Sequence, residues 1–412
     1  MKIAKNDFIK SIEIFPVFVA FYTLTGLSPI WYFLGLHRGI TLLSTFAFAF
    51  LVFLTQSRGV PKWYFYFSII TLSLCLISGI YWSHPRVGLY GIYFLMSLFI
   101  ILVISQSEFE KFIDLSTPII VALLIGAWVG TIYAFMGGEA IAVFQNPDSR
   151  GNGLFLSTLS NAANRINGNL LIRPAGIYDE PGTFSFIICA LSTVRHFRNK
   201  KEGITLAMIL MGFVTLSLAH FIFSLVYIGH LLLNRILIIT KLICKKILRA
   251  ILLAILISIF LTLTPAGLAL DNFLLARLEV TEEGTIEGDN RSDQMFHAME
   301  KLNPTVFIWG IDSICTVDAS ECSRRHGEMG NNPLSPLVFR GILVSLLHYV
   351  CLFTFLILGI TRRNRFLLFG IFLLFLQRPS IMSPGYDIWA VAILSSVPLK
   401  SSSTRKGSTF QL

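Results

Sequence analysis

The sequence predicts an all-α, polytopic integral membrane protein, and three observations lead to this fold class. Of its 412 residues, 54% are hydrophobic and only 14% are charged, whereas about a quarter of the residues in soluble domains are charged. The apolar residues occur in separate runs, and a helix needs about 20 apolar residues to cross about 30 Å of hydrocarbon. Runs such as 69–80 and 250–263 do not alternate as the strands of a β-barrel would. Because a backbone in hydrocarbon must satisfy its own hydrogen bonds, these runs are expected to be helices.

The apolar runs predict about twelve transmembrane helices. They are expected near residues 14–35, 40–56, 63–82, 88–105, 116–136, 182–197, 203–219, 221–234, 250–269, 336–360, 365–377 and 387–399. The first is expected to stay uncleaved, because no small-residue cleavage site follows the basic N-terminus. The seventh and eighth meet around Ala219 and His220, where the chain could form either a tight hairpin or one long kinked helix.

The net charge of +10 would indicate a nucleic-acid partner in a soluble protein, but here the placement of the charges matters more. Basic residues mark the cytoplasmic loops of membrane proteins. With the N-terminus inside, nearly every lysine falls on the cytoplasmic side, and Lys301 is the exception. The sequence therefore predicts two cytoplasmic termini and no nucleic-acid partner. It divides into N-terminal helices, a first outer loop, central helices, a second outer loop and C-terminal helices with a cytoplasmic tail, at residues 1–136, 137–181, 182–269, 270–335 and 336–412.

The second outer loop is long and holds most of the acidic residues. Residues 295–309 predict an amphipathic helix, with an apolar stripe of Met295, Met299, Leu302 and Val306. Long loops with such a pattern are usually functional, although a passive extracytoplasmic cap is the alternative. Cys315 and Cys322 both fall on the oxidising side, where a disulfide could form as a local staple. No cluster with the spacing of metal ligands is visible, so no metal or other cofactor is expected.

The segment before the sixth predicted helix carries the first candidate site residues. Arg173 is followed by Asp179, Glu180 and Pro181. Proline suits the first turn of a helix, so both acids would lie at the positive helix N-terminus. Simple helix capping is the alternative explanation for each acid. A guanidinium group is the preferred partner of phosphate oxygens, which makes Arg173 a candidate for anion binding.

The second outer loop carries the other candidates. Arg291 lies at the start of the predicted amphipathic helix, where exposed N–H groups also favour anions. The alternative is an ordinary solvated charge. His326 could accept a proton at neutral pH, although a lone loop histidine is often incidental.

Three histidines fall within predicted helices, and intramembrane ionisable residues are candidates for function. For His220, His230 and His348 we favour neutral interhelical hydrogen bonds. Acidic residues are essentially absent from the centres of the predicted helices, which weighs against an ion-coupled transporter.

These segments and their layout resemble the O-antigen polymerase and O-antigen ligase superfamily. The family pattern of an arginine, a glycine and an acidic residue before proline looks like Arg173, Gly176 and Glu180 here. The later pattern of an arginine, an amphipathic helix, a proline and a glycine, and then an asparagine-rich segment before the next helix, resembles Arg291, Pro304, Gly310, Asn331, Asn332 and the run 339–342. The resemblance covers residues 170–350, and the first five predicted helices match only in hydropathy.

The resemblance implies a polysaccharide polymerase of the bacterial inner membrane, acting at its periplasmic face on an oligosaccharide linked to undecaprenyl pyrophosphate. A chain-length regulator and a flippase would be its partners, with no metal. Arg173 and Arg291 would bind the diphosphate, and Glu180, Asp179 or His326 would deprotonate or orient the acceptor hydroxyl. The residues expected to contact substrate are Arg165, Tyr178, Asn331, Asn332 and Arg340.

Two other classes of function remain open: an O-antigen ligase or another lipid-carrier-dependent glycosyltransferase, and a transporter. Ligase-type members have a histidine immediately before the asparagine at the end of the second loop, where this chain has Asn331 and its nearest histidine is His326. This departure favours polymerase over ligase and leaves the catalytic base open. A flippase or other transporter for lipid-linked oligosaccharides would place charged residues along the helix bundle and have shorter loops.

Overall fold

The computed structural model shows a mainly helical protein. It describes residues 28, 60–84, 87, 91–145, 151–161, 163–166, 169–235, 290–317, 319–327, 330, 332–361, 365–377 and 385–397. The predicted helices at 40–56 and 250–269, and the one at 14–35 apart from residue 28, lie outside this part of the chain.

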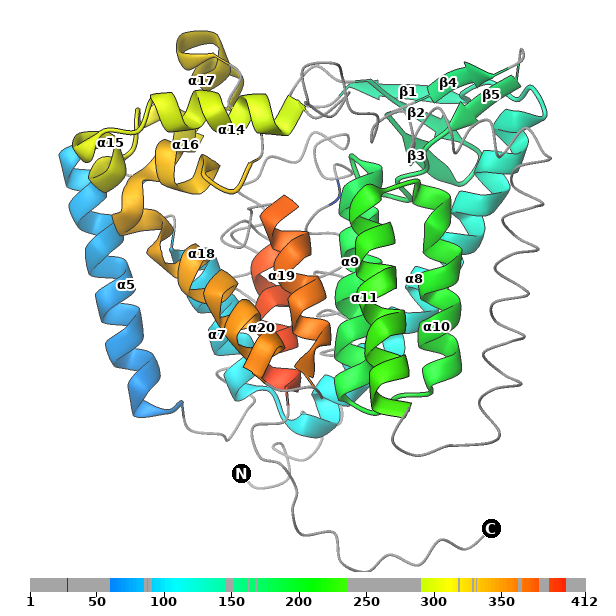
Figure 1. The fold of residues 1–412 in the computed structure, drawn as a ribbon, viewed down its shortest axis with the longest axis horizontal. Helices are drawn as coiled ribbons and strands as arrows, with labels where there is room; N and C mark the ends of the chain where they lie inside the picture. The colour runs from blue at the N-terminus through cyan, green and yellow to red at the C-terminus, as the bar shows by residue number, and fades with distance from the viewer. Residues whose placement is uncertain are drawn as a thin grey trace, which may run out of the picture.

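The larger layer is a bundle of helices, with a smaller layer of strands and short helices across one end (Figure 1). The helices of the bundle are α5 (Lys62–Tyr81), α7 (Ile92–Val103), α8 (Gln106–Phe135), α9 (Pro181–Phe197), α10 (Glu202–Met211), α11 (Leu218–Arg235), α18 (Ser335–Thr361), α19 (Leu367–Gln377) and α20 (Tyr386–Ser396). Each coincides with one of the apolar runs in the sequence.

Three of the described helices are long and apolar enough to cross a membrane. They are α5 with 20 residues, α8 with 30 and α18 with 27. At about 1.5 Å per residue, 20 residues span about 30 Å, the thickness of the hydrocarbon layer. The other helices of the bundle are shorter, down to 10 residues in α10. The structure therefore confirms a helical chain with candidate membrane spans, while the number of spans stays a prediction.

Helix α8 begins ten residues before the predicted span because a capping box extends it. The Ser105 side chain accepts a hydrogen bond from the Glu108 N–H, and the Glu108 carboxylate accepts one from the Ser105 N–H, both at 3.2 Å. These two bonds satisfy backbone donors that the first turn would otherwise leave free. The polar first turns of α8 therefore form a helix without contributing to the apolar run.

The prediction of an all-α fold is wrong in the first outer loop, which contains five short strands. Strands β1 (Ala142–Gln145), β2 (Gly151–Phe155) and β3 (Thr158–Ser160) form an antiparallel sheet. Strands β4 (Ala163–Ile166) and β5 (Asn169–Ile172) form a separate antiparallel pair. Phe155 and Ile172 are buried against Ala134 at the end of α8. Packing on this helix, rather than a strong strand pattern in the sequence, stabilises the strands.

The chain between α9 and α11 forms a hairpin and not one kinked helix. Helix α10 is followed by the 3₁₀ turn η2 (Gly212–Thr215), and Leu216 then adopts a positive φ of 46°. This conformation reverses the chain, so α10 and α11 both pack beside α9 (Figure 1). The tip of the hairpin lies at residues 216 and 217, slightly before Ala219 and His220.

The second outer loop contains α14 (Asn290–Glu300), α15 (Pro304–Trp309), α16 (Ile314–Val317) and α17 (Ala319–His326). The prediction of one amphipathic helix over 295–309 is wrong, because α14 ends at Glu300 and Asn303 caps the start of a second helix, α15. Asn303 is extended, and its side chain accepts hydrogen bonds from the Thr305 and Val306 N–H groups at 3.0 Å each. Met299 of the expected apolar stripe is 53% exposed, whereas Val306 is buried.

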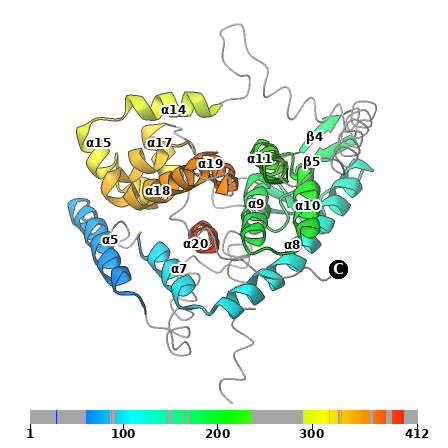
Figure 2. The same cartoon turned by 60° about the horizontal axis from the view of Figure 1, so that its bottom comes forward.

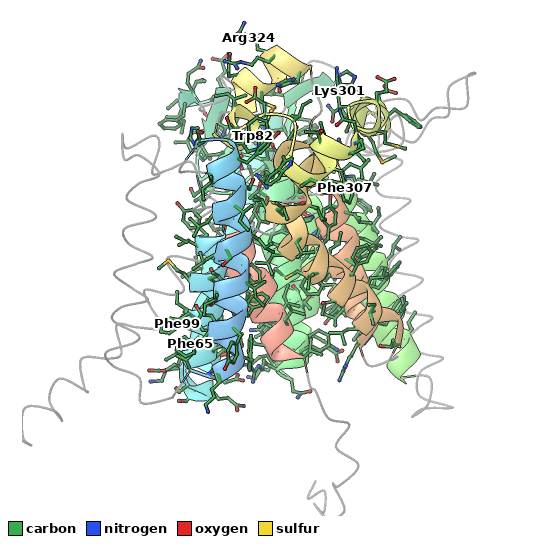
Figure 3. All side chains as sticks on the ribbon, turned by 90° about the vertical axis from the view of Figure 1, so that its left-hand side faces the viewer. Phe65, Trp82, Phe99, Lys301, Phe307 and Arg324 are labelled. Atoms are coloured by element: carbon green, nitrogen blue, oxygen red, sulfur yellow. A yellow bond between two sulfur atoms is a disulfide. The ribbon has the colours of Figure 1, made fainter. Side chains whose placement is uncertain are left out.

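Helix α20 occupies the centre of the bundle, with the other helices around it (Figure 2). Its Trp389 is fully buried beside Phe112 of α8. By contrast, α5 exposes apolar side chains on its outer surface, and Phe65 is 56% exposed. In Figure 3, Phe65 and Trp82 mark the two ends of α5, and the charged Lys301 and Arg324 lie in the layer beyond Trp82. Apolar side chains on the outer surface, with charged side chains beyond the ends of the helices, are what a helix bundle in hydrocarbon requires.

Candidate active site

Both outer loops lie at the same end of the bundle, which one shared site would require. Helix α8 leads into strands β1–β5 on one side, and α14–α17 cover the other side (Figure 1). The second loop is fixed to the end of α5, because the Trp82 indole donates a hydrogen bond to the Trp309 carbonyl at 2.8 Å. The Tyr81 and Trp309 rings also stack at 4.2 Å.

The backbone around Arg173 is held against strand β3. The Arg173 carbonyl accepts a hydrogen bond from the Ser160 hydroxyl at 2.9 Å. The Gly176 N–H donates to the Thr158 hydroxyl at 2.9 Å, and the Leu159 N–H donates to the Gly176 carbonyl at 2.8 Å. Gly176 has a φ of 64°, a conformation in which a side chain is strained. The sequence therefore positions the half-buried Arg173 on a fixed backbone.

Tyr178, Asp179 and Glu180 connect this segment to α9. Tyr178 is fully buried with its ring stacked on Phe184 at 5.7 Å, and this burial raises the pKa of its hydroxyl. Asp179 is half-buried and accepts a hydrogen bond from the Thr183 hydroxyl at 3.1 Å. Glu180 occupies the N-cap position before Pro181, but its side chain makes no capping hydrogen bond. Capping therefore does not account for the Glu180 carboxylate.

The start of α20 adds two residues that sequence reasoning missed. The Tyr386 hydroxyl lies 3.5 Å from the Thr183 hydroxyl, which in turn binds Asp179. The neighbouring Asp387 is fully buried, and one of its oxygens accepts hydrogen bonds from the Gly385 and Ile388 N–H groups at 3.0 and 2.7 Å. Its other oxygen has no hydrogen-bond partner within the described part of the chain. The available signal was an acid at the first residue of a predicted apolar helix.

In the second loop, His326 is paired with Asp312, which sequence reasoning did not single out. The His326 Nε2 atom lies 3.3 Å from an Asp312 carboxylate oxygen. The other oxygen accepts a hydrogen bond from the Ile314 N–H at 3.0 Å, and Arg325 lies 3.5 Å from the carboxylate. Burial alone would raise the pKa of Asp312, but these hydrogen bonds and the charges of His326 and Arg325 lower it. The net pKa is below the usual value. Fourteen residues separate the pair, so no local motif identified it.

A disulfide holds the segment that carries this pair. Cys315 of α16 and Cys322 of α17 are bonded, as the sequence allowed. Hydrogen bonds from Arg324 and Arg325 lower the pKa of Glu321 to about 2. The His326 carbonyl lies 3.1 Å from the His297 ring on α14. Helix α17, which ends at His326, is thus connected to α16 by the disulfide and to α14 by the His326 carbonyl.

The end of the second loop is shaped by Asn332 and by a kink in α18. Asn332 is fully buried, and its side-chain oxygen accepts hydrogen bonds from the Leu334 and Ser335 N–H groups at 2.9 and 3.1 Å. This arrangement gives Asn332 a capping role at the start of α18. Arg340 is half-buried and immediately precedes Gly341, where α18 leaves helical geometry.

Three predicted site residues fall partly or wholly outside the described structure. Arg291 is the second residue of α14 and Arg165 lies in β4, but the side chains of both are outside the description. Asn331 lies outside it entirely. The N-terminal end of α14, which carries Arg291, points toward the side of the strands in Figure 1.

The structure gathers the remaining candidates into two groups. The first group, which precedes α9, consists of Arg173, Tyr178, Asp179 and Glu180. The second group, which precedes α18 or lies in its first two turns, consists of His326, Asn332 and Arg340. Helix α19 packs against both α9 and α18. The segments before α9 and before α18 both lie at the end of the bundle that carries the strands and α14–α17 (Figure 1). The arrangement offers cationic side chains for an anion and carboxylate or imidazole groups for a proton. Within the described residues there is no group of three or more side chains suited to a metal ion.

Comparisons with protein families, curated proteins and solved structures found no match to this chain.

Proposed function

We propose that this protein is a polysaccharide polymerase that transfers a glycan from undecaprenyl pyrophosphate to a second lipid-linked repeat unit. The observation that carries the proposal is the common location of two segments distant in the sequence. The connection bearing Arg173 and the helix bearing Arg291 belong to layers at one end of an apolar bundle. The product would be O-antigen, capsule or exopolysaccharide.

The chemistry suits these residues. The acceptor hydroxyl oxygen attacks the anomeric carbon of the donor sugar, and its proton passes to a base. The bond from the anomeric carbon to the pyrophosphate oxygen breaks, and undecaprenyl pyrophosphate leaves with the electron pair. Arginines placed in advance stabilise the developing negative charge, and such electrostatic stabilisation often contributes more to the rate than any other effect. Pyrophosphate is a good leaving group, so the proposed step requires no metal.

His326 is the proposed base, because Asp312 orients its ring as a carboxylate orients a catalytic histidine elsewhere. Asp179 and Glu180 are the alternatives from the first segment. The buried Asn332 would act by holding the start of α18, and Tyr178 would support the segment from within. Arg165, Asn331 and Arg340 remain proposed contacts to the glycan or the lipid diphosphate.

The proposed protein lies in the bacterial inner membrane with about twelve spans, following the apolar runs. Both termini are cytoplasmic and both outer loops are periplasmic. A flippase would supply its substrate, and a chain-length regulator would control its product.

An assay with purified protein and lipid-linked repeat units tests the proposed function. Lengthening of the glycan by successive units is the expected result. A single transfer to a lipid A core would instead indicate a ligase. Absence of any transfer, with movement of the lipid-linked glycan across vesicles, would indicate a transporter and overturn the proposal.

Substitution of the histidine pair tests the proposed base. His326→Ala is expected to lower the rate of chain lengthening by about 10²-fold, the usual contribution of a general base. Asp312→Asn should also lower the rate, because it weakens the orientation of the ring. The two effects should not multiply in the double variant, because both substitutions act on one imidazole. An unchanged rate of chain lengthening in His326→Ala would assign the proton to Asp179 or Glu180 instead.

The topology has its own test. A cysteine introduced at Gly284 is expected to react with a membrane-impermeant thiol reagent in intact spheroplasts. The same reagent should leave a cysteine introduced at Gly203, in the first turn of α10, unmodified, because that end of the bundle is proposed to be cytoplasmic. Protection at residue 284 would place the second loop in the cytoplasm.

A further inference from the structure

A crevice between α8 and α10 lies at the end of the bundle opposite the candidate active site. Its volume is about 660 Å³, and Arg195 near the end of α9 also lines it. Pro118 of α8 and Ile204 and Ala207 of α10 are exposed along its walls, and Met208 is buried below them. The crevice is therefore apolar over most of its length and accessible from the outer surface of the bundle.

Helix α10, which forms one wall of the crevice, is about as long as one leaflet of a membrane is thick. Helix α10 has 10 residues, which at about 1.5 Å per residue gives about 15 Å, half of the hydrocarbon thickness of about 30 Å. Met211 marks the inner end of the crevice, and its carbonyl accepts a hydrogen bond from the Trp128 indole of α8 at 3.1 Å. Helix α8 is itself one of the candidate membrane spans. This wall is therefore long enough to lie along one acyl chain of a leaflet.

Basic side chains surround one end of the crevice, called its outer end here because it lies at the surface of the bundle farthest from the candidate active site. Arg195 is only 3% exposed, and its guanidinium donates hydrogen bonds to the hydroxyls of Thr117 and Thr205 at 2.6 and 3.1 Å. Lys200 binds the carboxylates of Glu110 and Asp114 at 2.7 and 2.8 Å, so its charge is balanced. Among the lining residues, Asp114 is the one carboxylate against three cations.

Lys201 supplies the charge that an anionic ligand would meet. Its side chain is exposed at the outer end of the crevice, and its ammonium makes no ion pair within the described residues. The Lys201 carbonyl accepts a hydrogen bond from Arg195 at 3.3 Å, which fixes the backbone of this lysine. The outer end therefore presents an exposed cation, Lys201, on a fixed backbone beside an apolar channel.

We propose that this crevice binds one anionic phospholipid of the adjacent leaflet. The phosphate would lie at Lys201, over the fixed Arg195, and an acyl chain would run between Pro118 and Ala207. Basic pockets between helices at the cytoplasmic surface are suited to anionic lipid headgroups. A free phosphate would use only the charged end, and a zwitterionic lipid would not use the positive charge. This site is distinct from the proposed active site and goes beyond the proposed function.

Lipid retention by the purified full-length chain tests this proposal. The protein would be placed in nanodiscs with equal amounts of phosphatidylglycerol and phosphatidylcholine, and native mass spectrometry would count the lipids retained after release. Preferential retention of phosphatidylglycerol is expected. Lys201→Ala should weaken this retention about fivefold, the usual effect of one lysine near an anionic surface. Ala207→Trp should fill the crevice and remove the retained lipid.

Lys111→Ala is the matched control, because Lys111 is exposed on α8 near the same end but does not line the crevice. It should retain the lipid as the unsubstituted protein does. An equal loss in Lys111→Ala and Lys201→Ala would overturn the proposal, and so would equal retention of the two lipids or displacement by millimolar inorganic phosphate. If Ala207→Trp does not fold, Ala207→Leu carries the same test.

Discussion

Replacing Arg291 with alanine is expected to abolish polymer formation while leaving the protein inserted in the membrane. The reason is the proposed role of its guanidinium, which stabilises the pyrophosphate as it leaves. Loss of one such donor usually lowers turnover by about 10²- to 10³-fold. Arg173→Ala should have a similar effect. The measurement is the distribution of glycan lengths formed from lipid-linked units by each variant.

Two further variants test whether the loss comes from a catalytic role of Arg291 and not simply from removing a positive charge from the loop. Arg324→Ala is the control, because this exposed arginine of the same loop pairs with Glu321 and has no proposed role. It should give normal chain lengths. If Arg173 and Arg291 act on one diphosphate, the double variant should lose less than the product of the two single effects. Normal chain length in Arg291→Ala would remove this residue from the site.

Gly341→Ala is expected to cause the largest loss of stability, because two glycines allow α15 and α18 to meet. Gly341 has a φ of 68°, and a Cβ placed there would lie 2.2 Å from the Ile308 carbonyl oxygen and 2.6 Å from the Gly310 nitrogen. Gly310 likewise has a φ of 89° and approaches the Phe339 carbonyl. Backbone strain alone costs about 1–3 kcal/mol, and the contact adds to it. We expect the free energy of unfolding to fall by about 3 kcal/mol or more.

Thermal unfolding of the purified protein in detergent measures this effect. Gly203→Ala is the matched control, because nothing lies within 4 Å of a Cβ at that position in the first turn of α10. Alanine there should leave the midpoint unchanged or raise it slightly, since alanine favours helix over glycine. Equal midpoints for Gly341→Ala and the unsubstituted protein would mean that α18 can straighten without cost.

The sequence located the long helices closely. The spans expected at 63–82 and 336–360 appear as α5 at Lys62–Tyr81 and α18 at Ser335–Thr361. An apolar run is a local property, and each run carries its own signal because the backbone of a helix pairs within one segment. Pro304 also indicated in the sequence that one helix ends before it, but the spacing of the expected apolar stripe favoured one continuous helix.

The contacts between distant segments were beyond what the sequence could determine. The pairing of His326 with Asp312 depends on how α16 and α17 fold against each other. The strands of the first outer loop depend on packing against α8, and no alternation of apolar and polar residues in the sequence indicated them. Asp387 is buried because α20 lies in the centre of the bundle, which its sequence alone does not specify.

The sequence by itself determined that this is a helical chain with apolar segments of membrane-spanning length, where those segments lie and which loops carry its polar chemistry. Only the tertiary structure decided how the two outer loops fold, that His326 has a carboxylate partner and that Gly310 lies against α18. The reason is physical: hydropathy and capping act over a few neighbouring residues, whereas a site forms from side chains that the folded backbone brings together.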